Sequence, residues 1–375
     1  MTAPSILRVG LIGCGEVAQV VHIPTLNFLS DYYQITYLCD VSQNALEHCQ
    51  KKVTGGTAPE ITKDASVLCK SDNVDVVFVV NSDEYHCAHA LIALENDKSV
   101  LIEKPMALND RDADLISAAA KKSKGKVMVG YMRRYAPIFE DAVKEIGGLD
   151  KINYARVRDI IGPNDIFVNQ SGTFPKRFSD FTEADGEDRA ARGADIVKQA
   201  LEVEAGVSDP HPLTQRTWRL LCGLGSHDLS LMREALGMPV GVLGARILNG
   251  NGPFVTALFD YGSFVCTYET GINSLPLFDA CIEIVGQSKS VTVQYDTPYV
   301  KGLPIIMTIK ENVNGEYHES KIRKTYEDPY TVEAKKLYKL VTEGTPVKTT
   351  PEDAEKDLEL FRMIIRAAVG STDSK

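Results

Sequence analysis

The chain has 375 residues, a length that predicts two domains, and its 44% hydrophobic and 25% charged residues are typical of a globular protein. Acidic residues outnumber basic ones by 51 to 41, and the net charge of −10 argues against nucleic acid or an anionic membrane as a partner. The 8 cysteines form no CxxC pair and no zinc-type cluster, so we expect reduced thiols and no metal site. Neither a leader-like segment nor about 18 consecutive apolar residues is present, and a cytoplasmic location is therefore expected.

Residues 1–150 alternate strand-like apolar runs with helical patterns. Strands are predicted at 6–12, 34–39, 75–80, 99–102 and 126–130. Helices are predicted at 17–22, at 42–53 behind the N-cap Ser42, at 84–95, and at 110–124 behind the N-cap Asn109. Short, nearly continuous apolar strands between helices indicate a parallel sheet covered on both faces. Right-handed crossovers then make residues 1–150 a doubly wound α/β domain.

The first strand-to-helix turn reads Gly13-Cys14-Gly15-Glu16-Val17-Ala18, the G-x-G-x-x-A form of the dinucleotide-binding fingerprint. Gly13 permits the tight turn, Gly15 lets the backbone approach a pyrophosphate, and Ala18 lets the helix lie close to the sheet. Asp40 ends the second strand, where a carboxylate can accept hydrogen bonds from both ribose hydroxyls; the alternative is that it caps a turn. Because no Arg or Lys follows at 41–43, NAD is favoured over NADP as the cofactor.

The motifs of the chain resemble those of the Gfo/Idh/MocA oxidoreductases. The shared segments are GCGEVA at 13–18, HIP at 22–24, DVVFVVNSDEYH at 75–86, EKP at 103–105, GYMRRY at 130–135, GSHDL at 225–229 and a closing helix at 350–371. The resemblance is strong over 6–150 and recurs at intervals to the C-terminus. It implies an N-terminal Rossmann domain and a C-terminal α/β domain at 151–375 with a large open, mostly antiparallel sheet. That sheet is often the oligomer interface in the family, so a homodimer or homotetramer is expected.

The resemblance also implies roles for residues of the first domain. Lys104, at the carboxyl end of a strand, is expected to contact the substrate oxygen and the nicotinamide ribose and to take part in proton transfer; otherwise a lone lysine is a solvated surface charge. The X-Pro bond that follows Lys104 is a candidate for the cis form. Expected on the cofactor side are Glu16, Val17, Asn81, Ser82, His86 and Glu103. Tyr131 and Arg133 are expected at the substrate, and of Arg133 and Arg134 one is expected to be a surface ion-pair partner.

From about residue 150 alternating patterns predict strands at 151–160, 254–260, 263–270, 280–285, 290–295 and 305–309, with a hairpin turn at Tyr261-Gly262. Helices are predicted at 331–342 and 352–368. Residues 162–212, with a helix at 190–203, are too long for an ordinary connection and are interpreted as a lid, an interface arm or a surface insertion.

A helix beginning near Gly223 carries His227, which the resemblance places in the active site as the residue that exchanges a proton with the substrate. The family's Asp four residues earlier is replaced by Gly223, which puts the usual Asp–Lys–His relay in doubt. Asp228 points about 100° away from His227 around the helix, yet is retained as a substrate candidate. Trp218, as a sugar-stacking face or a core residue, and Arg219, as a hydroxyl donor, complete the substrate set.

These features predict an NAD(H)-dependent oxidoreductase that acts on a sugar, polyol, cyclitol or related keto compound. Two alternatives stay open. One is a hydrolase or eliminase of the same family that recycles its own NAD, and the other is a regulator that binds a dinucleotide without turnover. The intact Lys104 argues against the regulator, because a binding protein does not require that amine.

Overall fold

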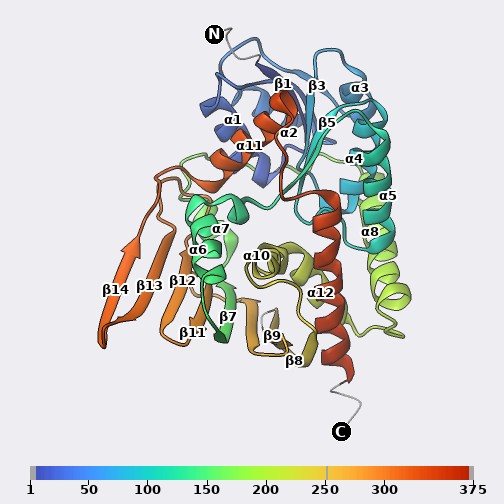
Figure 1. Ribbon diagram of the computed structural model, residues 1–375. Helices are drawn as coiled ribbons and strands as arrows, with labels where there is room; N and C mark the ends of the chain where they lie inside the picture. The colour runs from blue at the N-terminus through green and yellow to red at the C-terminus, as the bar shows by residue number, and fades with distance from the viewer. Residues whose placement is uncertain (1–5, 251, 371–375) are drawn as a thin grey trace. The chain divides into compact units, whose positions relative to one another are not determined.

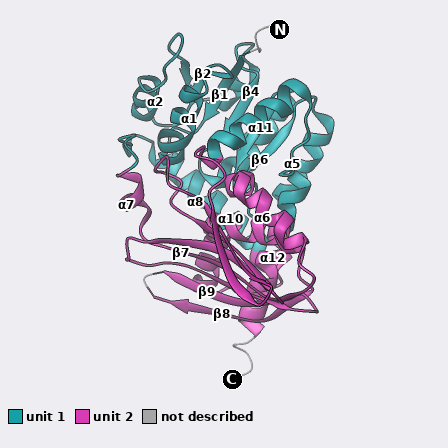
Figure 2. Ribbon diagram, turned by 60° about the vertical axis from the view of Figure 1, so that its left-hand side comes forward, with its two compact units in different colours: residues 1–131, 171–200, 330–356 teal, residues 132–170, 201–329, 357–375 magenta. Residues whose placement is uncertain are grey.

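The computed structural model describes residues 6–250 and 252–370, which fold into two compact units, each built from separate stretches of the chain. Unit 1 comprises the chain up to Tyr131 together with Ser171–Ala200 and Tyr330–Lys356 (Figure 2). Unit 2 comprises Met132–Gln170, Leu201–Pro329 and the chain from Asp357 onward. The chain thus passes between the units more often than the single boundary expected at residue 150 requires.

Unit 1 is built on a six-stranded parallel sheet with the order β3-β2-β1-β4-β5-β6 (Figure 1). Its strands are β1 (Leu7–Ile12), β2 (Tyr33–Cys39), β3 (Glu60–Thr62), β4 (Val76–Val79), β5 (Ser99–Glu103) and β6 (Val127–Gly130). The central strands β4 and β5 are buried along their whole length, as expected for a sheet covered on both faces. The doubly wound parallel fold predicted from the apolar runs is confirmed.

The helices of unit 1 are α1 (Ile23–Phe28), α2 (Gln43–Gln50), α3 (Ala65–Lys70), α4 (His86–Glu95), α5 (Asp110–Lys122), α8 (Glu183–Lys198) and α11 (Pro329–Glu343). Both predicted N-caps are confirmed: the Ser42 side chain accepts from the backbone N–H of Ala45, and the Asn109 side chain accepts from that of Asp112. Strand β3 and helix α3 were not predicted, because elements of three and six residues are too short to show a clear period. No helix within the described residues is long and apolar enough to span a membrane.

Unit 2 contains an eight-stranded sheet with the order β14-β13-β12-β11-β7-β10-β9-β8. Its strands are β7 (Ile152–Ile161), β8 (Gly241–Asn249), β9 (Pro253–Asp260), β10 (Val265–Ile272), β11 (Phe278–Gly286), β12 (Lys289–Tyr295), β13 (Ile306–Val313) and β14 (Glu316–Ile322). The pair β7–β10 is parallel and the other pairs are antiparallel, which confirms the mostly antiparallel sheet. Strand β14 escaped prediction because every one of its residues is exposed, so it shows no apolar alternation.

The remaining helices are α6 (Pro137–Gly147), α7 (Asn164–Val168), α9 (Pro212–Leu220), α10 (Ser226–Leu236) and α12 (Pro351–Gly370). Helix α8 begins seven residues before the predicted start at 190, because Thr182 and Asp185 form a capping box there. The Thr182 side chain accepts from the backbone N–H of Asp185, and the Asp185 side chain accepts from the backbone N–H of Thr182, so the helix begins at Glu183. The cysteine thiols are free.

Candidate functional site

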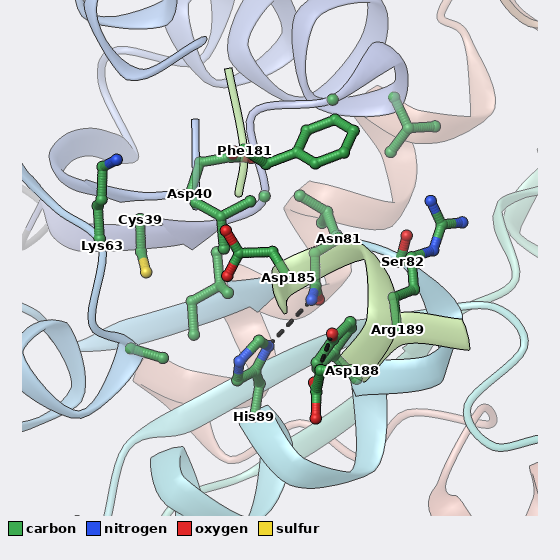
Figure 3. Close-up of a pocket in the computed structure, with 18 of the residues that line it drawn as sticks. Cys39, Asp40, Lys63, Asn81, Ser82, His89, Phe181, Asp185, Asp188 and Arg189 are labelled. Atoms are coloured by element: carbon green, nitrogen blue, oxygen red, sulfur yellow. Dashed lines mark hydrogen bonds between the residues drawn. The ribbon is translucent and has the colours of Figure 1, made fainter. Parts of the chain in front are cut away.

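A cavity of about 540 Å³ lies in unit 1 at the carboxyl ends of β1, β2 and β4 (Figure 3). This volume falls within the range of about 300–1,000 Å³ for small-molecule sites. The strand order reverses direction between β1 and β4, and open parallel sheets bind their ligands outside the strand ends at such a point. The predicted cofactor residues that line the cavity are Gly13, Gly15, Glu16, Val17, Asp40, Asn81 and Ser82.

The two glycines of the turn after β1 have different structural environments. Gly13 has a φ of +108°, and a Cβ there would lie 2.6 Å from the backbone nitrogen of Asn81, so no other residue fits. A Cβ on Gly15 would meet nothing within 4 Å, so the backbone at Gly15 faces open space beside the cavity. Ala18 is fully buried beneath the turn. The turn therefore leaves room for a large group such as a pyrophosphate at Gly15.

The Asp40 carboxylate is fixed at the end of β2 by two backbone donors. The N–H of Cys14 donates to Oδ2 at 2.7 Å, and the N–H of Ser42 donates to Oδ1 at 2.8 Å. Burial raises the pKa of Asp40 above its ordinary value, although these two bonds and the nearby Lys63 oppose the shift. Each carboxylate oxygen keeps a second acceptor site, so Asp40 can still accept from two ribose hydroxyls.

Three further charged residues surround Asp40. Lys63, from the loop between β3 and α3, lines the cavity, as does Asp185 of α8. The Asp180 carboxylate binds Ser42 and Asn44 next to Asp40. Lys63 opposes the rise in the pKa of Asp40. The pKa of Asp180 is lowered first by its hydrogen bond from Ser42 and that of Asp185 by its hydrogen bond from Thr182, and Lys63 adds to both shifts, so one cation lies among three carboxylates. The net charge of these residues at this end of the cavity is therefore negative.

The loop after β4 forms the opposite wall. Asn81 and Ser82 line the cavity, and the Asn81 amide nitrogen lies 3.0 Å from Nδ1 of His89, which burial keeps at a pKa of about 4 (Figure 3). His86 is buried outside the lining: its Nδ1 lies 2.8 Å from the Pro105 carbonyl and its Nε2 lies 3.1 Å from the Asn81 carbonyl. His86 thus joins the loops after β4 and β5 and does not face the cavity.

Glu103 and Lys104 end β5, and the Lys104–Pro105 peptide is cis, as the sequence indicated. The buried Glu103 carboxylate binds two groups at once: His22 Nε2 at 2.9 Å through Oε1, and the backbone N–H of Lys104 at 3.0 Å through Oε2. Burial acts to raise the pKa of Glu103, but the His22 hydrogen bond and the charges of His22 and Lys104 outweigh it, so the pKa is lowered. Glu103 therefore holds the backbone of Lys104. Neither Glu103 nor Lys104 is among the residues that line the cavity, and Lys104 is half-buried.

In unit 2, Arg133 lies in a buried ionic cluster. Its Nη1 donates to Asp159 at 2.9 Å and to Asp228 at 2.5 Å, and all three residues are at most 2% exposed. Burial acts to lower the pKa of Arg133, but the charges of Asp159 and Asp228 outweigh it, so the pKa is raised. The expectation that one of Arg133 and Arg134 is a surface residue is wrong, because Arg134 is also buried and pairs with Glu234.

The other substrate candidates have different environments. Trp218 is fully buried and meets Phe361 edge-on at 5.9 Å, so its interpretation as a core residue is confirmed and the stacking face is not available. Tyr131 is buried, Arg219 is half-buried on α9, and His227 is half-buried on α10. Asp228, one residue on, turns into the Arg133 cluster, as the 100° step predicted.

The glycines before His227 differ in what they permit. A Cβ on Gly225 would lie 2.7 Å from the hydroxyl of Tyr268, so this glycine allows α10 to approach β10. A Cβ on Gly223 would meet nothing within 4 Å, so no steric conflict explains the absence of an aspartate there.

Several lining residues were not predicted from the sequence: Lys63, Tyr85, His89, Phe181, Asp185, Asp188 and Arg189. Most of them come from residues 181–189, which the length of segment 162–212 marked only as unusual. The capping box at Thr182 was the one local signal that could have placed a helix there. Within the described part of the chain, no three His, Cys, Asp or Glu side chains are grouped as metal ligands.

Residues 7–131 match the model of a family described as "Oxidoreductase family, NAD-binding Rossmann fold". An inositol 2-dehydrogenase of Paracoccus denitrificans is 30% identical over 159 residues, which are 41% of this chain and 46% of that protein. A 1-carboxy-3-chloro-3,4-dihydroxycyclohexa-1,5-diene dehydrogenase of Comamonas testosteroni is 31% identical over 159 residues, 42% of this chain and 38% of that protein. The matched segments thus span less than half the length of each of these curated relatives. A crystal structure of a 3-ketoreductase from Actinomadura kijaniata with NADP covers 97% of this chain and 98% of its own at a TM-score of 0.70 and 16% identity, which shows a shared fold.

Proposed function

We propose that this chain is an NAD(H)-dependent oxidoreductase of the Gfo/Idh/MocA type, a proposal supported by the match of residues 7–131 to the model of that family, which is described as having an NAD-binding Rossmann fold. It moves a hydride between the nicotinamide and a secondary alcohol or ketone of a sugar, polyol or cyclitol. The observation that carries the proposal is the cavity at the strand-order reversal, with open space at Gly15 and the fixed Asp40 carboxylate. The activity in the name of the Paracoccus relative supports a cyclitol or similar substrate.

An absorbance screen at the NADH band tests this function. Polyols, cyclitols and keto-sugars are offered to the purified chain with NAD(H) and, separately, with NADP(H). We expect NADH to form or disappear with at least one compound. Dinucleotide binding without any net change in NADH would instead favour one of the two alternatives, the regulator or the hydrolase or eliminase that recycles its own NAD.

The dinucleotide, when bound, supplies the hydride acceptor or donor. The backbone at Gly15 leaves space for its pyrophosphate, and Asp40 accepts from ribose hydroxyls. Lys104 exchanges or holds the proton at the substrate oxygen, a role that suits an amine at a strand's carboxyl end. The Glu103–His22 pair fixes the Lys104 backbone from beneath and is a positioning element.

The cofactor preference is a first prediction. We expect NAD(H) to bind at least about tenfold more tightly than NADP(H), a difference of about 1.4 kcal/mol. A 2′-phosphate would meet Asp40, Asp180 and Asp185, and Lys63 offsets only one of these charges. Fluorescence titration with NADH and with NADPH measures the ratio of the two dissociation constants. Asp40→Asn should bring the two constants closer together. Equal or better NADP(H) affinity in the wild type would refute the preference.

His227 gives a second prediction, which rests on its position in the family motif. An imidazole titrates near neutral pH and suits proton exchange with an alcohol oxygen. We expect His227→Asn to lower kcat/KM about a hundredfold and to remove an inflection of the pH–rate profile between about pH 6 and 8. A variant that keeps both its rate and that inflection would make His227 structural and assign the proton to another residue.

We also infer that two or four copies assemble through the outer face of the sheet of unit 2. This face carries half-buried charges on β7 and its neighbours: Arg156 binds Glu269, and Arg158 lies near Glu269 and Asp279. Light scattering should give the mass of a dimer or tetramer. Arg158→Glu places a third carboxylate beside two others and should shift the mass toward the monomer, whereas a monomeric wild type would end this inference.

A further inference from the structure

The buried cluster of unit 2 combines one guanidinium with two carboxyl groups. Asp159 of β7 and Asp228 of α10 both lie within hydrogen-bond distance of the same nitrogen of Arg133, Nη1. All three side chains are at most 3% exposed, so water does not screen their charges. If both carboxyl groups were ionised, the cluster would bury an uncompensated negative charge, which is costly in a protein interior.

Each carboxyl group also has one oxygen outside the bonds to Arg133. Asp159 Oδ1 and Asp228 Oδ2 are buried and have no hydrogen-bond partner among the described residues. Two neighbouring carboxyl groups can satisfy such oxygens by sharing a proton, because the protonated group donates to the ionised one. Burial and the charge of Asp159 raise the pKa of Asp228 well above its usual range, which agrees with this arrangement.

The groups around the two carboxyls add no second positive charge to balance them. Tyr268 of β10 and Tyr295 of β12 are buried there, and burial raises the pKa of both phenols well above the usual range, so both are neutral. The Arg133 guanidinium lies over the Tyr295 ring at 5.5 Å. Arg134, the next residue along the chain, pairs with the Glu234 carboxylate. A single ionised carboxylate therefore balances Arg133.

Asp228 also fixes the part of α10 that carries His227. Helix α9 continues into α10 through a π-helical turn at Leu221–Gly225. Such a turn replaces the regular bonds of the α-helix by longer ones, so the direction of the next turn depends on contacts outside the helix. Asp228 supplies such a contact through its bond to Arg133, directly after His227 in the chain.

We propose that Asp159 and Asp228 share one proton, and that Asp228 in this form is a positioning residue for His227. The positioning role rests on the proposed function, in which His227 exchanges a proton with the substrate, whereas the shared proton does not. A carboxyl whose folded pKa is raised loses its contribution to stability as the pH rises from about 4, the usual aspartate pKa, through the folded pKa. Asparagine at position 228 keeps the shape of the protonated carboxyl and cannot ionise, so it removes this pH dependence.

Infrared spectroscopy of the full chain, without cofactor, tests the shared proton. A protonated carboxyl absorbs at a higher C=O frequency than a carboxylate, and ordinary aspartates are ionised at pH 7. We expect such a band in the wild type at pH 7 and its loss in both Asp228→Asn and Asp159→Asn. Asp150→Asn, at an exposed aspartate just before β7, is the matched control and should keep the band.

Urea unfolding gives an independent readout of the same charge. Each single asparagine variant should have a urea midpoint at pH 7 that equals or exceeds that of the wild type, because one carboxylate still balances Arg133. The double variant Asp159→Asn/Asp228→Asn leaves the buried guanidinium without a carboxylate and should lower the midpoint strongly. From pH 5 to pH 9 the midpoint of the wild type should fall relative to that of Asp228→Asn.

The positioning role is tested by kinetics. Asp228→Ala removes the bond to Arg133 and should lower kcat about a hundredfold, the effect of a displacement of about 1 Å, while NADH affinity in a fluorescence titration stays unchanged. Asp228→Asn keeps that bond and should retain both the rate of the wild type and the inflection of the pH–rate profile between about pH 6 and 8.

The outcomes separate the two parts of the proposal. Absence of the protonated-carboxyl band from the wild type, or a midpoint lowered by either single asparagine substitution, would show that both carboxylates are ionised and overturn the shared proton. A kcat of Asp228→Ala equal to that of the wild type refutes the positioning role. A chain that turns over no compound refutes the proposed function and the positioning role together, while the infrared result still decides the shared proton.

Discussion

Replacement of Lys104 by Met is expected to lower kcat by about two orders of magnitude or more, the range for a lost acid–base group. Methionine keeps most of the length of the unbranched side chain and lacks the amine. The residue is half-buried, and its backbone stays bonded to Glu103, so the fold and most NAD binding should persist. Steady-state rates together with NADH titration separate the two effects.

The matched control is Lys126→Met, an exposed lysine next to the start of β6, which should keep the wild-type rate. A Lys104→Met enzyme with near-wild-type kcat removes Lys104 from the mechanism. If the rate falls and NAD affinity falls equally, the amine binds the cofactor and does not move a proton.

Replacement of Arg133 by Met is expected to lower the free energy of unfolding by about 3–5 kcal/mol at pH 7, because it leaves two buried carboxylates without their cation. In the wild type, burial and then repulsion from Asp159 raise the pKa of Asp228 well above its usual range, and Arg133 opposes this shift. Without Arg133 the pKa of Asp228 must rise further. Urea unfolding measures the loss.

The pH dependence of this loss has a definite sign. A carboxyl whose folded pKa is raised contributes its stability at low pH and loses it as the pH rises through the folded pKa. The difference between wild type and Arg133→Met should therefore shrink as the pH falls from 8 to 5. Arg216→Met, an exposed arginine on α9, is the control and should change stability by about 0.5 kcal/mol at most. Equal losses in both variants, or a loss independent of pH, would show that the cluster carries no buried charge.

Local sequence determined the sheet and the glycine turn of unit 1. Strand runs such as Val76–Val79 and Ser99–Glu103 are apolar along their whole length, and this pattern alone dictates a sheet covered on both faces. Gly13 and Asp40 are equally local, since the turn and the strand end that hold them are set by a few neighbouring residues. The caps at Ser42 and Asn109 follow from side chains that bond within their own first turn.

Only the tertiary structure decided which distant residues complete the cavity and which predicted site residues are buried elsewhere. Asp180 and Gln19 are joined to partners far along the chain, and no spacing rule relates Gln19 to Lys176 or Asp180 to Ser42. The resemblance placed Arg133 at the substrate, and the sequence by itself carries no sign of the ion-pair partners of this arginine. Asp159 and Asp228 reach it from a strand and a helix that approach only after folding. Periodicity reports which face of an element is buried, whereas ion pairs and long-range hydrogen bonds depend on how the elements pack.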